Sequence, residues 1–96
     1  MAKVRVIARD QAREGKTEEL KAVLKQLLEP TRKEQGCIYY DFFESNLPGV
    51  LLFNEEWASM EDLKAHATTE RMARIQAEAA PFRVGPTEVN ILTPVE

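Results

Sequence analysis

Hydrophobic and polar residues alternate at the start of the chain and then change to the spacing of a helix. The segment Lys3–Arg9 alternates and is rich in β-branched residues, which is typical of a β-strand. After a loop at Gly15, apolar residues recur every three or four positions, as Leu20, Val23, Leu24, Leu27 and Leu28. This stripe predicts a helix with Thr17 as its N-cap and Gly36 as its stop, kinked or tightened near its end by Pro30.

Two apolar segments on either side of a short turn occupy the middle of the chain. Cys37–Ser45 is rich in aromatic residues, and Val50–Trp57 is a mainly aliphatic run that acquires acids toward its end. The residues between them, Asn46–Gly49, have the chemistry of a tight turn. The pattern therefore predicts two antiparallel strands joined as a β-hairpin.

The last third of the chain returns to helical spacing and ends in an alternating segment. Ser59, with Asp62 three residues later, resembles a capping box in which Asp replaces the usual Glu or Gln. A helix or a pair of short helices continues from there and stops at Pro81, and Thr87–Thr93 is a final strand. The order β-α-β-β-α-β is the ferredoxin-like arrangement, an α+β fold that we expect to form one domain over residues 1–96.

The two faces of this sheet are expected to have different neighbours. Right-handed crossovers place both helical regions on one face, so the chain leaves the other face uncovered. In the third strand, alternate residues form two sets, Leu51, Phe53, Glu55 and Trp57 against Val50, Leu52, Asn54 and Glu56, and both faces of the hairpin are largely apolar. We expect a second copy of the chain to cover the open face in a homodimer. The alternative is a monomer with an apolar face that its loops partly shield.

Composition and charge narrow the class of protein. The chain has 96 residues, a net charge of -3 with acids and bases mixed along it, and a single Cys. These features argue against a nucleic-acid partner and against an internal disulfide, and no Cys/His cluster has the spacing of a metal site. No leader and no apolar run of membrane-spanning length is seen. We expect a cytoplasmic protein with no membrane, nucleic-acid or metal partner.

A few singular residues are candidates for chemistry. His66, the only His, lies one helical turn after Asp62, whose carboxylate can orient the imidazole as a general base; the alternative is an exposed ion pair. Trp57, the only Trp, is either part of the core or a wall of a site. Asn54 places an amide in an apolar strand, where it needs a backbone partner or a ligand oxygen.

Two longer motifs carry a resemblance to a known family. They are T-R-x-E-x-G-C-I-x-Y at Thr31–Tyr40 and E-x-W-x-S-x-x-x-L-x-x-H at Glu55–His66. With the Leu-rich helix before them, they resemble the antibiotic biosynthesis monooxygenase family, including its quinol monooxygenase-like members, over Val4 to about Leu92. The resemblance implies a dimeric α+β barrel of two ferredoxin-like subunits. It also implies oxidation of an electron-rich phenol, quinol or anthrone by molecular oxygen without a metal, flavin or other cofactor.

The resemblance also implies roles for particular residues. His66 would take the phenolic proton, Asp62 would orient it, and Asn54 would donate to a developing oxyanion. The residues expected to contact the substrate are Trp57, Tyr40, Glu55, Phe42 and Arg71. Many relatives have a second His where this chain has Arg71, which either binds an anionic substrate or lies at the surface.

Other activities are compatible with the same sequence. An isomerase of a small carbonyl compound would use the same His without oxygen, and a non-catalytic dimer would only hold an aromatic ligand. Haem binding is disfavoured because His66 is the single imidazole available as an axial ligand.

Overall fold

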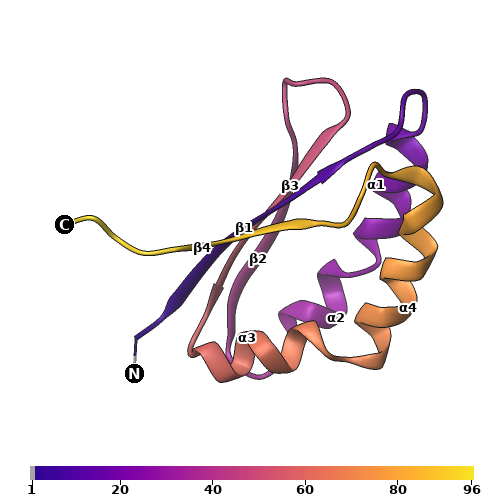
Figure 1. Cartoon of the computed structure of the whole chain (residues 1–96). Helices are drawn as coiled ribbons and strands as arrows, with labels where there is room; N and C mark the ends of the chain where they lie inside the picture. Colours follow the sequence, from indigo (N-terminus) through magenta and orange to yellow (C-terminus); the bar gives the residue numbers. More distant parts are fainter. Residues whose placement is uncertain (1) are drawn as a thin grey trace.

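A four-stranded antiparallel sheet organises residues 2–96, which the computed structural model describes (Figure 1). The elements in chain order are β1 (Val4–Gln11), α1 (Thr17–Lys25), α2 (Leu28–Arg32), β2 (Cys37–Glu44), β3 (Val50–Trp57), α3 (Met60–Ala67), α4 (Glu70–Ala79), the short 3-10 helix η1 (Ala80–Phe82) and β4 (Glu88–Leu92). The strand order is β2-β3-β1-β4. This is the ferredoxin-like α+β fold, and the prediction from the hydrophobic pattern is confirmed.

The first helical region is divided, although the sequence predicted one helix. Thr17 is the first residue of α1, and Lys16, which makes no side-chain capping bond, is its N-cap, so the predicted cap at Thr17 was wrong. The helix then tightens: the amides of Gln26 and Leu27 bond to carbonyls three residues back. Pro30 explains the break, because its ring lacks an N–H and clashes with the carbonyl four residues earlier, which belongs to Gln26.

The second helical region is a pair of short helices, each with its own cap. Ser59 Oγ accepts a hydrogen bond from the Asp62 amide at 3.1 Å and begins α3, as the capping pattern predicted. Thr69 Oγ1 accepts from the Met72 amide at 3.0 Å and begins α4. Pro81 lies inside η1, where the helical region ends.

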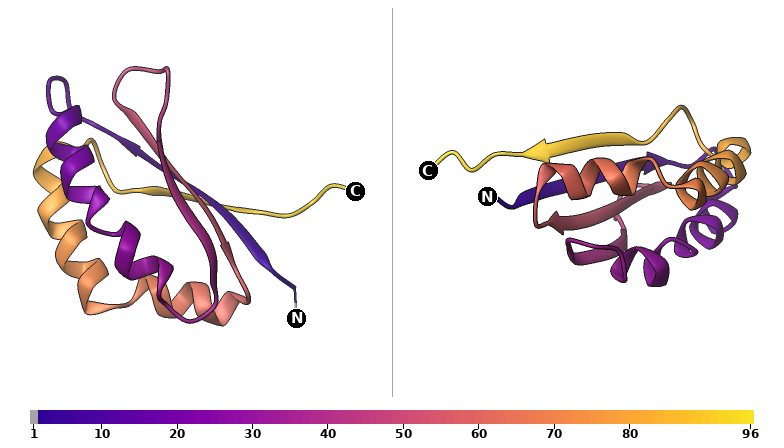
Figure 2. Two further views of the ribbon diagram at one scale, coloured as in Figure 1. Left: turned by 180° about the vertical axis from the view of Figure 1, so that it is seen from behind. Right: turned by 90° about the horizontal axis from the view of Figure 1, so that it is seen from below.

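The helices all lie on one face of the sheet, as the handedness of the crossovers predicted (Figure 2). On that face the strand register aligns Val6 of β1 with Glu55 of β3, and Glu55 with Tyr40 of β2. The next row consists of Ala8, Phe53 and Phe42. Since directly opposed residues point to the same side, these rows form the floor beneath the helices.

Within residues 2–96 no helix or loop covers the opposite face of the sheet. Alternation along the strands assigns to this face the apolar residues Ile7, Tyr39, Phe43, Leu52 and Leu92, together with the charged residues Arg5, Arg9, Asp41, Glu56 and Glu88. Phe43 is 53% exposed and Leu92 42%. The face is thus mixed in character, and its apolar part is centred on the β2–β3 hairpin.

Candidate functional site

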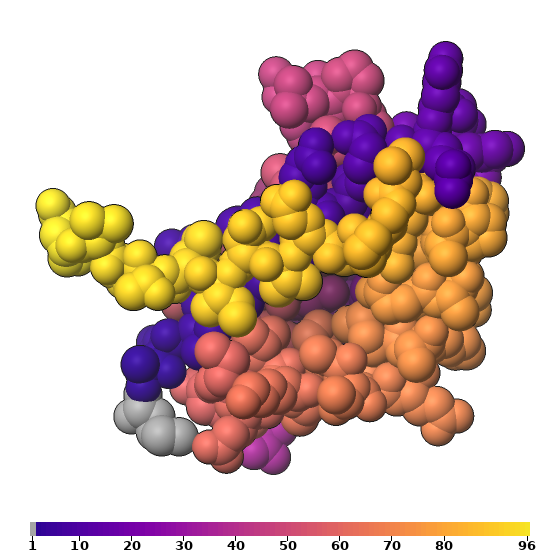
Figure 3. Space-filling view, viewed as in Figure 1, coloured from indigo at the N-terminus to yellow at the C-terminus, as the bar shows by residue number. Residues whose placement is uncertain are grey.

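A cavity of about 500 Å³ lies between the helix-facing side of the sheet and helices α3 and α4. In the space-filling view the surface of the molecule is hollowed between β4, in yellow, and the orange helices (Figure 3). Most of its lining is apolar and includes Val6, Ala8, Phe53, Leu63, Met72, Val89 and Ile91. A cavity of this size accepts a small organic molecule, and its few polar groups are therefore informative.

His66 stands at one end of this cavity and is held from behind by a carboxylate. Its ring is 6% exposed, and its Nδ1 lies 2.9 Å from Glu34 Oε1. The other oxygen of Glu34 accepts from Arg71 Nη1 at 2.8 Å. The Trp57 ring packs against the imidazole at 4.6 Å between centroids, and the Tyr40 ring meets it edge-on at 5.5 Å. The imidazole is therefore fixed in position on three sides.

The chemistry of the imidazole follows from this arrangement. Burial lowers the pKa of His66 below its ordinary 6.5, although the hydrogen bond to Glu34 opposes the shift. The ring is therefore neutral at pH 7. Because a carboxylate accepts hydrogen bonds, Nδ1 carries the proton, and Nε2 keeps a free lone pair. Nε2 has no hydrogen-bond partner among residues 2–96. A buried, oriented, neutral imidazole of this kind is suited to accept a proton.

The predicted partner of His66, Asp62, does not orient the imidazole. Asp62 Oδ2 accepts from Ser59 Oγ at 3.0 Å and so takes part in capping α3. Asp62 and His66 line a smaller second cavity of about 230 Å³ together with Glu34, but Nδ1 is directed at Glu34. The loop that carries Glu34 comes close to Asp62 because Gly36 adopts φ +81°, and a Cβ at Gly36 would overlap the Asp62 side chain.

Glu55 contributes a second titratable group to the cavity. Its side chain is 4% exposed and lines the cavity, and Trp57 Nε1 donates to its Oε1 at 2.9 Å. Burial raises the pKa of Glu55, while the bond from Trp57 opposes the shift. Trp57 itself is fully buried and does not line the cavity. Trp57 therefore contacts both Glu55 and His66 on the sides of these residues that face away from the cavity.

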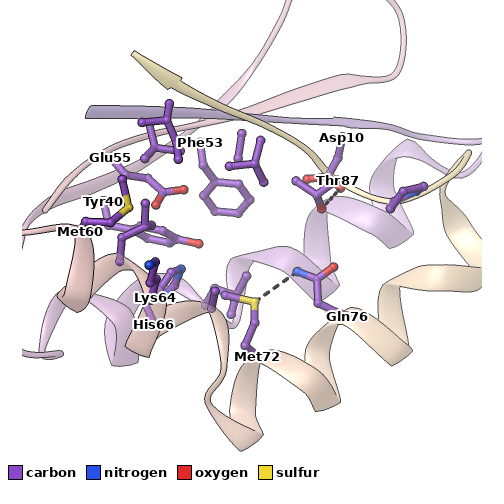
Figure 4. Close-up of a pocket in the computed structure, with 18 of the residues that line it drawn as sticks. Asp10, Tyr40, Phe53, Glu55, Met60, Lys64, His66, Met72, Gln76 and Thr87 are labelled. Carbon is purple, nitrogen blue, oxygen red and sulfur yellow. Dashed lines mark hydrogen bonds between the residues drawn. The ribbon is translucent and has the colours of Figure 1, made fainter. Parts of the chain in front are cut away.

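Tyr40 directs its hydroxyl into the cavity, close to His66 (Figure 4). Burial raises the pKa of the Tyr40 phenol far above its ordinary 10, and the charge of Glu55 adds to the effect. Tyr40 is therefore a neutral hydrogen-bond donor. Phe42 does not line the cavity; its ring stacks on the ring of Phe53, with 4.3 Å between the ring centroids.

The structure thus brings together some of the predicted site residues and separates others. His66, Tyr40 and Glu55 line one cavity. Arg71 reaches the site only through Glu34. Asn54 faces the open side of the sheet, aligned with Ile7 and Asp41, and its buried Oδ1 has no partner among residues 2–96.

A second ion pair, which the sequence did not reveal, stands at the other end of the cavity. Arg83 Nη1 donates to Asp10 Oδ1 at 3.0 Å and to Thr87 Oγ1 at 2.9 Å. Thr87 Oγ1 in turn donates to Asp10 Oδ1 at 2.7 Å. All three residues line the cavity, and Asp10 and Arg83 are 1% and 7% exposed. The pair joins residues 73 positions apart, so no local pattern could have shown it.

Across residues 2–96, no group of three or more His, Cys, Asp or Glu side chains is placed to hold a metal ion. Over the same residues, no helix has the length and apolar character needed to cross a membrane.

Comparison with known proteins identifies the family. The model of the antibiotic biosynthesis monooxygenase family matches residues 3–78. The chain is 32% identical over 93 residues to a Mycobacterium tuberculosis protein named "Putative monooxygenase Rv0793", covering 97% of this chain and 92% of that protein. The solved structure of Rv0793 superposes with a TM-score of 0.88, covering 99% and 97% of the two chains. A conserved protein from Methanosarcina mazei Go1, 31% identical, has a TM-score of 0.86 over 96% and 92% of the chains.

The chain therefore belongs to the antibiotic biosynthesis monooxygenase family, as its motifs indicated.

Proposed function

We propose that this protein is a monooxygenase that oxidises an electron-rich hydroxyaromatic compound, such as a phenol, quinol or anthrone, with molecular oxygen and no cofactor. The observation that carries the proposal is the buried imidazole of His66, held by Glu34 and lining a mainly apolar cavity. Family membership supports the reaction class. We propose that the whole chain acts as one domain and works in the cytoplasm.

The proposed reaction begins with a proton transfer. His66 Nε2 takes the proton of the substrate hydroxyl, and Glu34 stabilises the imidazolium that forms. The resulting phenolate is electron-rich enough to reduce oxygen itself. Oxygen adds at a C–H position of the ring, and loss of water from the hydroperoxide leaves a new carbonyl. The substrate supplies all four electrons, one oxygen atom enters the product and the other leaves as water.

Tyr40 and Glu55 are placed to assist the later step. Both line the cavity beside each other on the strand pair β2–β3. Burial raises the pKa of both groups, and the Tyr40 phenol, whose pKa lies far above 10, keeps its proton. A neutral donor in an apolar cavity stabilises negative charge that develops on a peroxide oxygen. In this proposal Asn54 has no direct role, because it lies on the other face of the sheet.

We also propose that two copies of the chain associate through the open face of the sheet. Exposed Phe43 and half-buried Leu52 lie together there, and the unpartnered amide oxygen of Asn54 would gain a donor. Covering one large apolar side chain contributes roughly 1.5–3 kcal/mol. Sedimentation at decreasing concentration tests this: Leu52→Glu should dissociate a dimer that Lys25→Glu, on the exposed surface of α1, leaves intact. A stable wild-type monomer at all concentrations would exclude the association.

Oxygen consumption tests the activity itself. A panel of quinols and related phenols is presented to the wild type, His66→Ala, Trp57→Phe and a surface control, Arg74→Met. The proposal predicts substrate-dependent oxygen uptake by the wild type and the control, a large loss in His66→Ala and a smaller loss in Trp57→Phe. Equal uptake in all four proteins would remove the assignment of the site. Turnover of a small carbonyl compound without oxygen would indicate an isomerase instead.

A further inference from the structure

The ion pair at the far end of the cavity uses only one nitrogen of its guanidinium. Arg–carboxylate pairs are frequently bidentate, with two nitrogens facing two oxygens. Here both hydrogen bonds of Arg83, to Asp10 and to Thr87, come from the single nitrogen Nη1. Nε and Nη2 make no hydrogen bond within residues 2–96, and neither is among the fully buried unpartnered atoms. Arg83 thus lines the cavity with two guanidinium nitrogens that have no partner within residues 2–96.

The position of this pair relative to His66 is set by the sheet. Tyr40, which touches the imidazole, lies in the same row as Glu55 and Val6. Asp10 is four residues further along β1, a distance of about 13 Å in an extended strand. Figure 4 shows the same separation, with His66, Tyr40 and Glu55 at one end and Asp10 and Thr87 at the other. A single aromatic ring cannot reach both ends, whereas a substituted fused-ring compound can.

Charge decides which group fits the donors of Arg83. Asp10 is 1% exposed: its Oδ1 accepts from the guanidinium, and its Oδ2 is buried without a partner among residues 2–96. Together Asp10 and Arg83 carry no net charge. An additional carboxylate or phosphate would meet the buried carboxylate of Asp10 as well as the cation, and would lose its hydration in an apolar cavity. A neutral carbonyl oxygen accepts from the free N–H groups without either cost. The apolar side chains of Val89 and Ile91, which line the same cavity, fit an aromatic skeleton in between.

We propose that Arg83, fixed by Asp10 and Thr87, forms a distal subsite that binds a neutral carbonyl oxygen on the substrate, at the end opposite the hydroxyl that meets His66. Among the hydroxyaromatic compounds of the proposed function, this subsite selects those that carry a carbonyl group remote from the hydroxyl. This inference rests on the proposed function for the orientation of the substrate. The subsite itself is a property of binding and exists whether or not oxygen reacts.

Three naphthols test the subsite in the absence of oxygen. They carry an acetyl, an isopropyl or a carboxylate group on the ring remote from the hydroxyl, and naphthol fluorescence reports their dissociation constants. A hydrogen bond to a charged group predicts that the acetyl compound binds the wild type roughly 10- to 100-fold more tightly than its isopropyl isostere. The carboxylate compound is expected to bind more weakly than the acetyl compound.

Two variants locate the preference. Arg83→Lys keeps a cation for Asp10 but removes the free Nε and Nη2 donors. The double variant Asp10→Leu with Arg83→Met replaces the whole pair with apolar side chains, a change that proteins commonly tolerate. Both should bind the acetyl and isopropyl compounds almost equally, and Arg74→Met, a surface Arg paired with Glu78, should keep the wild-type ratio.

The outcomes separate this inference from the proposed function. A wild type with no preference for the acetyl compound, a preference that survives in both Arg83 variants, tighter binding of the carboxylate compound, or no binding of any naphthol would overturn the subsite. Oxygen uptake can fail while the preference stands, which would remove the oxygenase activity and leave the subsite. Conversely, uptake can persist when the preference is absent.

Discussion

Each end of the cavity pairs a carboxylate with a nitrogen-containing side chain, but the two pairs differ in burial and in their ability to change charge. At one end the carboxylate of Glu34 stands behind the imidazole of His66 and keeps contact with solvent through a second cavity. At the other end the carboxylate of Asp10 is sealed from solvent and holds the guanidinium of Arg83. An imidazole can gain and lose a proton near neutral pH, whereas a guanidinium stays charged.

This difference assigns the two ends to different tasks. In the proposed reaction, proton transfer belongs to the His66 end, where burial lowers the pKa of the imidazole and Glu34 can stabilise its protonated form. The proposed subsite gives fixed hydrogen-bond donation to the Arg83 end, where the guanidinium keeps its charge. One cavity can thus both react with a substrate and orient it.

The largest expected effect is on turnover at the His66 end. His66→Ala should lower kcat/KM about 100- to 10,000-fold, because general-base catalysis contributes this much. Circular dichroism should show that the variant stays folded. Wild-type kcat/KM in a folded His66→Ala protein would remove the distinction between the two ends.

The Arg83 end should dominate the effects on stability. Asp10→Ala leaves the guanidinium of Arg83 buried without its carboxylate and should cost about 3–5 kcal/mol of unfolding free energy, measured by urea denaturation. Glu34→Ala is the matched change at the other end. It should cost less, because the side chains of Glu34 and Arg71 are 16% and 34% exposed and water can replace part of the interaction. A larger cost for Glu34→Ala would contradict this ranking.

The pH profile distinguishes the neighbours of His66. Because burial lowers its pKa, the acidic limb of kcat/KM should lie below pH 6.5 in the wild type. Glu34 raises the pKa of His66 and Arg71 lowers it, so Glu34→Gln should move the limb to lower pH and Arg71→Gln to higher pH. A displacement of one pH unit corresponds to about 1.4 kcal/mol. Shifts in the same direction would show that these residues do not act through the imidazole.

Glu55→Gln should give the smallest effect, a small increase in the free energy of unfolding at pH 7. The pKa of Glu55 is raised on folding, so the free energy of unfolding of the wild type falls as the pH rises from 4.5 through the pKa of Glu55 in the folded protein. The Gln variant keeps an oxygen for the Trp57 indole and carries no charge. Urea denaturation should give the two proteins similar free energies of unfolding below pH 4.5, and a higher value for the variant at pH 7. A less stable variant at pH 7 would show that the carboxylate is needed for folding.

Local patterns were sufficient to predict the sheet and most of its connections. The alternation in Val50–Trp57, the turn at Asn46–Gly49 and the cap at Ser59 depend on neighbours within a few residues, and each is found in the structure. The sequence predicted that Pro30 kinks or tightens the end of the first helix, but the continuous apolar stripe concealed that the clash with Gln26 divides the region into two helices.

The site was harder to predict because its contacts are distant in sequence. Helical spacing made Asp62 and His66 neighbours, but the partner of the imidazole is Glu34, 32 positions earlier. Glu34 stood within the first family motif, so its presence was visible and its role was not. Asp10, Arg83 and Thr87 meet only after β4 returns beside β1, which no local pattern encodes.

The state of the single imidazole tests the central claim most directly. Tag-free protein labelled with ¹⁵N at histidine gives signals from His66 alone, since the chain has one His. A titration should show a pKa below 6.5 and, at pH 7, a neutral ring protonated at Nδ1, and Glu34→Gln should lower that pKa further. A ring that is cationic at pH 7, or a neutral ring protonated at Nε2, would contradict the assignment of His66 as the base facing the cavity.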